Sequence, residues 1–338
     1  MKKINKKDIG KVLHQWSQEF TVFVPSRENG VANLAKWDGK DTSFLDWYRN
    51  TVEPAKANFL PPMEKMFSFQ KDKVGYDLEL SLDEHKQIIF GIRPCDARAM
   101  AILDMTFTDS YEDPYYLSKR RNTVLIGLGC TNPYDSCFCT SLGISPAEST
   151  DVDLMLTDIG NQFLVEEITD VGKELMTRTN GVGEATQADE ANAKKIKETA
   201  FGKVTRRIET KDIDKKLLSC FDNQDYWEED AAKCISCGIC TFHCPTCYCF
   251  DINDELVKKQ GARFRNWDSC AFCIYTKMPM ENPREEKWQR VRQKVCHKYE
   301  FHPMNFGTIA CTGCGRCIRQ CPVNWDITQT LDSLPAKA

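Results

Sequence analysis

Two copies of one cysteine motif constrain the fold of this 338-residue chain more than any other feature of its sequence. The first copy reads CISCGICTFHCP over 234–245, and the second reads CTGCGRCIRQCP over 311–322. Both follow the spacing C-x2-C-x2-C-x3-C-P, which is typical of proteins that bind two [4Fe–4S] clusters. Three thiolates spaced in this way wrap three corners of a cubane, and the fourth cysteine points to the other cluster.

This exchange of the fourth ligand predicts two ligand sets. One [4Fe–4S] cluster is expected on Cys234, Cys237, Cys240 and Cys321, and the other on Cys311, Cys314, Cys317 and Cys244. Gly238, Gly313 and Gly315 fit this interpretation, because a residue without Cβ lets the backbone approach a cluster closely. A pair of zinc ribbons is the alternative, but zinc prefers two C-x2-C pairs separated by a longer loop.

A third iron–sulfur centre is predicted from cysteines outside the two motifs. One candidate set is Cys95, Cys130, Cys137 and Cys139 in the N-terminal half. The other lies between the motifs and consists of Cys247, Cys249 and Cys270, with Cys273 as a possible fourth member. A site shared between these sets is also open. Cys220 and Cys296 are instead expected to be small buried hydrophobic residues.

A strand–helix–strand pattern precedes the motifs. The apolar runs QIIFGI (87–92) and TVLIGLG (123–129) are typical of strands buried on both faces, and Pro94 opens a helix between them. Such a unit predicts two parallel strands with a right-handed crossover. Cys95 and Cys130 then follow the carboxyl ends of these strands, at the edge where open α/β sheets bind ligands.

Other local patterns predict the remaining elements of the N-terminal half. Asp8 is expected to cap a helix over 9–16, and a strand over 21–24 is expected to end at Pro25. Two prolines before residue 63 predict a short helix over 63–67. Also expected are a hairpin of 151–157 with 162–165 and a solvated helix over 189–203.

The uneven distribution of cysteine predicts two domains. Thirteen of the 18 cysteines lie between Cys234 and Cys321. The fold class expected is an α/β domain with a partly parallel sheet over residues 1–225, followed by a ferredoxin-like two-[4Fe–4S] domain over residues 226–338. The stretch between the two motifs is longer than a simple ferredoxin needs and is therefore interpreted as an insertion.

Composition excludes several classes of function. The formal net charge of −4 argues against nucleic-acid binding, which needs a basic surface. No apolar run approaches the roughly 18 residues of a membrane span, and MKKINKKDIGKVLHQW lacks the apolar segment of a signal peptide. A cytoplasmic location is therefore expected, where cysteines stay reduced and serve metal binding or catalysis.

The chain lacks the motifs of an independent catalyst. GLGCTN and GVGEAT each begin as G-x-G but have no third glycine of a dinucleotide fingerprint. No phosphate-binding loop, H-E-x-x-H or G-x-S-x-G motif is present. Clusters without a recognisable substrate or nucleotide motif indicate that electrons pass through the protein.

Several segments together resemble one known family. They are IRPCDARAMAILD, SCFCTSLG, CISCGICTFHCPTCYCF, RNWDSC and CTGCGRCIRQCP. They are similar to the family of the iron–sulfur subunit of anaerobic sulfite reductase. This family also includes the beta subunit of cytosolic sulfhydrogenases and the ferredoxin-like subunit of flavin oxidoreductases linked to heterodisulfide reductase. Six cysteines outside the ferredoxin motifs fall in segments typical of the family: Cys95, Cys137, Cys139, Cys247, Cys249 and Cys270.

The resemblance implies a function as well as partners. It implies one partner subunit that binds FAD and NAD(P)H and a catalytic partner of sulfite reductase, hydrogenase or heterodisulfide reductase type. The chain is expected to carry electrons between them without catalysis of its own. The alternatives are a cysteine-rich reductase with its own catalytic third cluster and a zinc-stabilised interaction scaffold. Heterodisulfide-reducing subunits carry adjacent cysteines, and this chain has no Cys-Cys pair.

Overall fold

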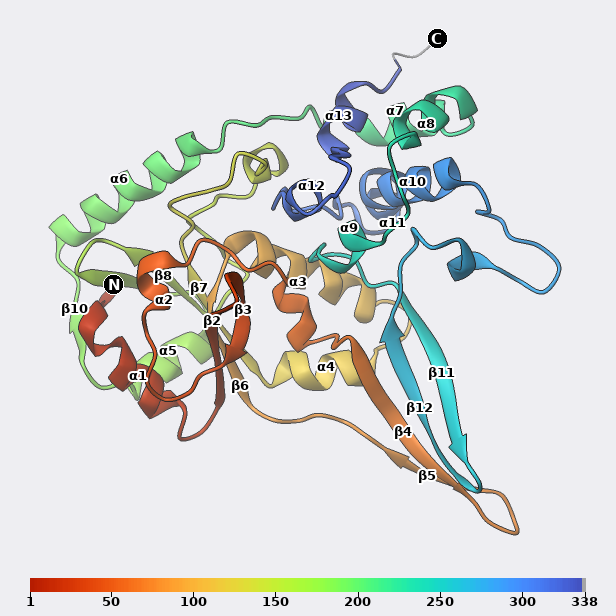
Figure 1. The fold of residues 1–338 in the computed structure, drawn as a ribbon. Coiled ribbons are helices and arrows are strands. Elements are labelled where there is room, and N and C mark those ends of the chain that lie inside the picture. The colour runs from red at the N-terminus through yellow and green to blue at the C-terminus, as the bar shows by residue number, and fades with distance from the viewer. Residues whose placement is uncertain (336–338) are drawn as a thin grey trace.

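The N-terminal half is built on a mixed eight-stranded sheet, seen in a computed structural model that describes residues 1–335 (Figure 1). The strands are β1 (Lys2–Asn5), β2 (Thr21–Glu28), β3 (Val31–Lys36), β6 (Gln87–Ile92), β7 (Thr123–Leu128), β8 (Leu154–Asp158), β9 (Gln162–Glu167) and β10 (Val182–Glu184). Their order across the sheet is β10-β1-β9-β8-β7-β6-β2-β3. Strands β2, β6, β7 and β8 run parallel, and all other neighbours are antiparallel.

Apolar cores cover both faces of this sheet. Because successive residues of a strand face opposite sides, Ile88 and Phe90 enter one core and Ile89 enters the other. Helices α1 (Ile9–Trp16) and α5 (Asp170–Thr177) pack into the first core. Helices α3 (Pro94–Phe107) and α4 (Pro114–Arg121) pack into the second. The predicted parallel unit of β6, α3 and β7 is confirmed, as are the hairpin of β8 with β9 and the polar helix α6 (Gln187–Lys203).

Two local predictions need correction. Helix α1 spans 9–16 as predicted and Asp8 is its N-cap residue, but the Asp8 side chain makes no capping hydrogen bond and its carboxylate accepts from Lys11 Nζ at 2.7 Å instead. Strand β2 also continues through Pro25 to Glu28. It pairs with β6 only over Thr21–Phe23, so the proline lies beyond the parallel ladder and interrupts no pairing there.

The predicted helix over 63–67 is also wrong, because this segment belongs to a strand. Strand β4 (Met63–Lys71) pairs antiparallel with β12 (Gln260–Trp267), which lies far along the chain. A four-stranded antiparallel sheet results, with the order β11 (Phe250–Val257), β12, β4 and β5 (Tyr76–Leu80). We call these four strands the arm, since Figure 1 shows them projecting from the body. Long-range pairing here overrides the local helix signal.

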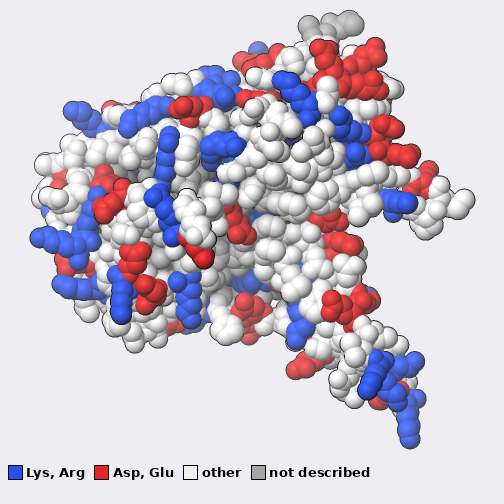
Figure 2. All heavy atoms as spheres, in the orientation of Figure 1, with Lys and Arg blue, Asp and Glu red and all other residues white. Residues whose placement is uncertain are grey.

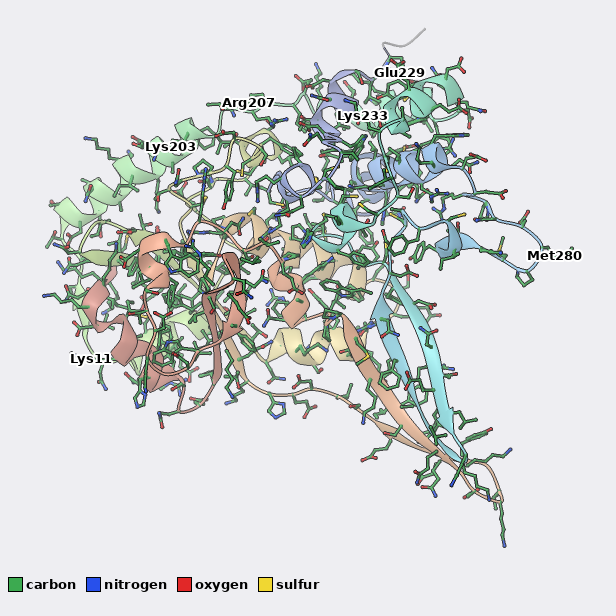
Figure 3. All side chains as sticks on the ribbon, viewed as in Figure 1. Lys11, Lys203, Arg207, Glu229, Lys233 and Met280 are labelled. Atoms are coloured by element: carbon green, nitrogen blue, oxygen red, sulfur yellow. The ribbon has the colours of Figure 1, made fainter. Side chains whose placement is uncertain are left out.

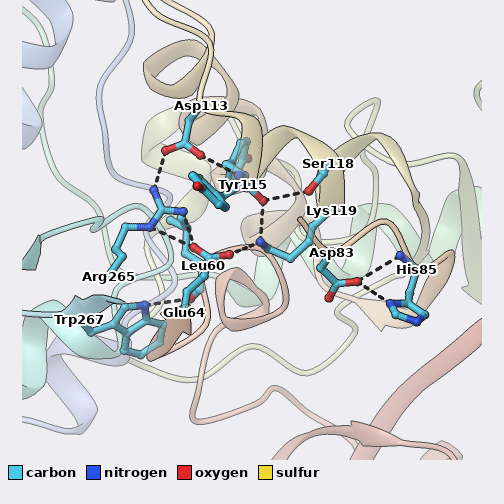
Figure 4. Close-up of polar contacts among 11 residues, drawn as sticks. Leu60, Glu64, Asp83, His85, Asp113, Tyr115, Ser118, Lys119, Arg265 and Trp267 are labelled. Carbon is cyan, nitrogen blue, oxygen red and sulfur yellow. Dashed lines mark hydrogen bonds and ion pairs between the residues drawn. The ribbon is translucent and has the colours of Figure 1, made fainter. Parts of the chain in front are cut away.

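A buried ion network anchors the arm to the body (Figure 4). Glu64 of β4 accepts hydrogen bonds from Lys119 of α4 and from Arg265 of β12. Arg265 also reaches Asp113, the N-cap residue of α4, at 2.5 Å. Each cation therefore has a carboxylate partner, as a buried charge requires, and the root of the arm is fixed to α4.

The C-terminal part is helical and carries both cysteine motifs. Its elements include α7 (Ile213–Cys220), α8 (Gln224–Ala231), α9 (Ile239–Phe242), α10 (Lys287–Cys296), the π-helical turn η5 (His297–Phe301), α11 (His302–Phe306), α12 (Arg316–Arg319) and α13 (Ile327–Asp332). A third core joins α7, α8, α10 and α13. Cys220 and Cys296 are buried in this core, as predicted. Within residues 1–335, no helix has both the length and the apolar character to cross a membrane.

Candidate metal centres

Four cysteines of the N-terminal half meet at the carboxyl edge of the large sheet. Cys95 follows β6 and Cys130 follows β7, while Cys137 and Cys139 lie at the 3-10 turn η3 (Cys139–Leu142). All four line one cavity. Of the two candidate ligand sets for a third cluster, the structure therefore brings together the first. We call this space the edge cavity.

Arg93 holds the two strand ends of the edge cavity together. Its guanidinium donates hydrogen bonds to the carbonyl oxygens of Leu128 and Gly129 at 2.9 and 2.6 Å. It also donates to the carbonyl oxygens of Arg49 and Tyr48. Since Arg93 directly precedes α3, these bonds fix the position of the Cys95 loop relative to the Cys130 loop.

Burial raises the pKa of three thiols in the edge cavity. Loss of contact with water raises the pKa of Cys139 to about 12 and also raises the pKa of Cys137. Burial also raises the pKa of Cys95, and the Asp96 carboxylate adds to this effect. Thiolates bind metals and thiols do not, so a metal bound by these three groups would displace their protons.

Five cysteines of the two motifs line a second cavity. They are Cys240, Cys244, Cys311, Cys314 and Cys317. The group contains the whole ligand set expected for the cluster of the second motif. Lys294 and Lys298 line the same cavity. We call this space the motif cavity.

The edge cavity and the motif cavity are neighbours, because Cys314 lines both. The contact depends on glycine. Gly313 has φ of +61°, and a Cβ there would lie 2.5 Å from the backbone nitrogen of Cys139. Gly315 has φ of +69°, and a Cβ there would lie 2.5 Å from Ser136 Oγ. The second motif thus packs directly against the segment that carries Cys137 and Cys139.

The first motif reaches the molecular surface. Cys237 is exposed, whereas Cys234 and Cys321 are partly buried against the third core. The backbone N–H of Trp325 donates to Cys321 Sγ at 3.2 Å. Cys240 lines the motif cavity, and its charge, with that of Cys237, adds to the burial that raises the pKa of Cys234. The expected set of Cys234, Cys237, Cys240 and Cys321 therefore extends from the surface to the wall of the motif cavity.

The cysteines between the motifs form two neighbouring pairs. Cys247 lies beside Cys244, Cys249 lies beside Cys270, and the charge of Cys249 also acts on Cys247. The Cys270 thiol donates a hydrogen bond to Cys249 and outweighs the effect of burial, so the pKa of Cys249 falls to about 6. Cys273 is exposed and contacts Asn282 and the Glu285 carbonyl instead. The structure does not bring Cys273 to the other members of this set.

The spacing of these side chains favours clusters over single ions. In the part of the chain that the structure describes, no three His, Cys, Asp or Glu side chains stand close enough to hold one metal ion. A zinc ribbon needs four ligands at about 2.0–2.3 Å from one ion. A cubane instead takes each thiolate at a different iron, so its ligands stand farther apart. The C-x2-C-x2-C-x3-C-P spacing of the cysteines that line the motif cavity is that of cubane ligands, so it indicates [4Fe–4S] clusters rather than zinc.

Buried lysines are the site residues that the sequence interpretation missed. Burial alone would lower the pKa of Lys294, but the charges of Cys240 and Cys317 outweigh it and raise the pKa. For Lys298 burial has the same lowering effect, and Cys244 and Cys247 reverse it. Lys294 Nζ is buried without a hydrogen-bond partner. An unpartnered ammonium in a cysteine-lined cavity fits an anionic cluster. In the sequence, the only signal of these lysines is that they lie four residues apart, next to Val291 and Val295 of the third core.

Comparison with known proteins now defines the class of this protein. Residues 233–325 match the family model of the 4Fe-4S dicluster domain, so the C-terminal part is an iron–sulfur domain. The chain is 31% identical to the beta subunit of sulfhydrogenase 2 from Pyrococcus furiosus over 319 residues, which cover 93% of this chain and 92% of that subunit. The chain belongs to the iron–sulfur subunit family that includes this beta subunit. No solved structure matches it.

Proposed function

We propose that this chain is an electron-transfer subunit of an oxidoreductase complex. It carries electrons between a partner that binds FAD and NAD(P)H and a catalytic partner of hydrogenase, sulfite reductase or heterodisulfide reductase type. One observation carries the proposal, namely that the edge cavity and the motif cavity share Cys314 and so lie in direct succession. Iron–sulfur clusters accept and release single electrons, and adjacent sites give a continuous path.

The ligand sets in this proposal are those predicted from the motif spacing. Cys234, Cys237, Cys240 and Cys321 hold one [4Fe–4S] cluster, and Cys311, Cys314, Cys317 and Cys244 hold the other, in a ferredoxin-like arrangement. The shared motif cavity supports the second set in particular. The chain's own residues exclude water and hold the thiolates in place.

A third [4Fe–4S] cluster is proposed on Cys95, Cys130, Cys137 and Cys139. The edge cavity supports this set, because all four cysteines line it. The rival set of Cys247, Cys249 and Cys270 has less support, since it offers three cysteines and Cys247 is hydrogen-bonded to Cys244 of the first motif. The edge cavity then forms one end of the path and the exposed Cys237 marks the other.

Two exposed apolar surfaces support the proposal of partner subunits. Tyr76, Leu78 and Leu80 of β5 are 61%, 61% and 65% exposed on the arm. The loop after Cys273 is a second such surface, with Met280 pointing away from the body at its tip (Figure 3). Exposed apolar patches of this kind mark protein–protein contacts. Reduced thiols and clusters of this type fit a complex that works in the cytoplasm.

Anaerobic reconstitution tests the proposed function. The isolated chain is expected to contain about eight irons from the two motif clusters and about twelve with the third. It is expected not to oxidise NAD(P)H alone and to become reduced once a flavoprotein partner is added. About four irons in total would contradict the two-cluster assignment. Reduction of a dye by NAD(P)H with the flavin-free chain, or turnover of sulfite or a disulfide by it, would favour an enzyme instead.

A further inference from the structure

Helix α10 and the π-helical turn that follows it place two lysines on the wall of the motif cavity. Lys294 and Lys298 are four residues apart, so they lie on one face of the helix, one turn apart. They are 6% and 4% exposed and line the cavity together with five cysteines. The turn η5 continues the helix past Cys296, so Lys298 is held by the same continuous element as Lys294.

Neither lysine has a carboxylate partner within residues 1–335. Lys298 Nζ donates to Thr246 Oγ1 at 2.9 Å and to the Ala310 carbonyl at 3.1 Å, and both acceptors are neutral. Lys294 Nζ has no hydrogen bond to protein oxygen or nitrogen; it faces the Cys240 thiol and lies 4.8 Å from the centre of the Trp325 ring. The buried cations at the root of the arm, in contrast, are all paired with carboxylates. Unpaired buried ammonium groups are costly, so their counter-charge has to come from inside the cavity.

We propose that Lys294 and Lys298 form a cationic wall that raises the reduction potential of the cluster in the motif cavity. The inference rests on the proposed function, since it requires a [4Fe–4S] cluster on Cys311, Cys314, Cys317 and Cys244. A cluster held by four thiolates is anionic, and an added electron makes it more so. Fixed positive charge in a low-dielectric site stabilises the reduced form more than the oxidised form.

The two lysines differ in their surroundings. Lys298 is directed by its two hydrogen bonds toward Thr246 and Ala310. Lys294 donates no hydrogen bond to protein oxygen or nitrogen. Lys294 is therefore the residue to change first, because its substitution removes a charge from the cavity wall without breaking such a bond.

The test is a redox titration followed by electron paramagnetic resonance on the anaerobically purified full chain. Lys294→Met removes the charge and keeps most of the apolar stem, and Lys294→Gln is a second neutral variant in case the first folds poorly. Lys294→Arg keeps the charge. Lys287→Met is the matched control, because Lys287 lies on the same helix with its Nζ bonded at the surface to the Ala232 carbonyl at 3.0 Å.

Both neutral variants are expected to keep wild-type iron and sulfide and to lower the midpoint potential of one cluster. The expected shift is at least tenfold in the reduction equilibrium, or about 59 mV for a one-electron couple. Lys294→Arg and Lys287→Met are expected to titrate as wild type. Unchanged midpoints in an iron-replete neutral variant would overturn the inference. A wild-type chain without cluster signals would instead overturn the proposed function, and with it this inference.

Discussion

Arg316 of the second cysteine motif forms a bidentate ion pair with Asp96 in the first turn of α3. The distances are 2.5 Å from Nη1 to Oδ1 and 2.7 Å from Nη2 to Oδ2, and the side chains are 0% and 2% exposed. Arg316 also donates to Asn50 Oδ1 at 2.8 Å and to the Thr51 carbonyl at 2.9 Å. The pair fastens the second motif to the carboxyl edge of the sheet, beside Cys95. The contact between the two cavities depends on this attachment.

Breaking this pair is expected to destabilise the protein strongly. Asp96→Asn leaves the buried guanidinium without its counter-charge, which costs about 3–5 kcal/mol of unfolding free energy. Replacing both residues, as Asp96→Leu with Arg316→Met, is expected to cost less, because no charge stays buried alone. Chemical denaturation of the anaerobic protein measures both. Asp151→Asn is the control, since Asp151 pairs with Arg98 near the surface and its loss is expected to cost less than about 1 kcal/mol. Equal losses for Asp96→Asn and the control would contradict this prediction.

The third cluster is tested by the double variant Cys137→Ala with Cys139→Ala. It is expected to lose about four irons and to keep the two motif clusters, because those draw no ligand from the edge cavity segment that carries Cys137 and Cys139. Electron transfer from the flavoprotein partner is expected to slow as well. Iron and sulfide analysis makes the measurement. Cys220→Ala is the control, a buried cysteine of the third core that is expected to cost a little stability and no iron. Wild-type iron in a soluble double variant would reject a metal role for this pair.

The arm is expected to bind a partner subunit through its apolar face. Leu78→Asp with Leu80→Asp puts charge on that face, where both side chains are already exposed, so folding and iron content are expected to stay as in wild type. Co-purification with the flavoprotein or the catalytic subunit is expected to be lost. Asp77→Ser with Glu79→Ser changes the opposite face of the same strand and serves as the control. Unchanged co-purification of the leucine variant would place the interface elsewhere.

Basic side chains gather at the tip of the arm (Figure 2). Their neutralisation is expected to weaken the association with a partner subunit only at low salt, because salt screens exposed charges.

One histidine gives the stability a defined pH dependence. Burial, helped by the charge of Lys298, lowers the pKa of His297 to about 4, and its Nε2 lies 3.2 Å from the Tyr248 hydroxyl. In the unfolded chain the pKa is about 6.5. Between these values the unfolded state binds the extra proton, so stability is full above about pH 6.5 and falls as the pH drops toward 4.

The measurement is the unfolding free energy at pH 7.0 and at pH 5.5 for wild type and His297→Gln. Wild type is expected to lose about 1 kcal/mol more than the variant over this interval. Other titrating groups are common to both proteins and cancel in the comparison. His14→Gln, at an exposed position of α1, is the control and is expected to follow wild type. The same loss in wild type and in His297→Gln would show that His297 does not carry this dependence.

Several features of this protein follow from local sequence alone. The spacing of the two cysteine motifs led to the iron–sulfur domain, which the family match over 233–325 confirms. The apolar runs at 87–92 and 123–129 led to β6 and β7 and to their parallel pairing. These signals are local, because a cubane needs its thiolates within one short loop and a buried strand needs a continuous apolar run. The ligand sets themselves stay predictions.

Tertiary structure decided what depends on residues far apart in the chain. Strand β4 pairs along one side with β12, which lies far along the chain, as well as with its sequence neighbour β5. The sequence offered two candidate ligand sets for a third centre. The fold places the four members of one set around a single cavity, namely Cys95, Cys130, Cys137 and Cys139. The pairing of Arg316 with Asp96 and the burial of Lys294 left no unambiguous local pattern. Removal of a charge from water depends on every segment packed around it, and only the folded chain specifies that packing.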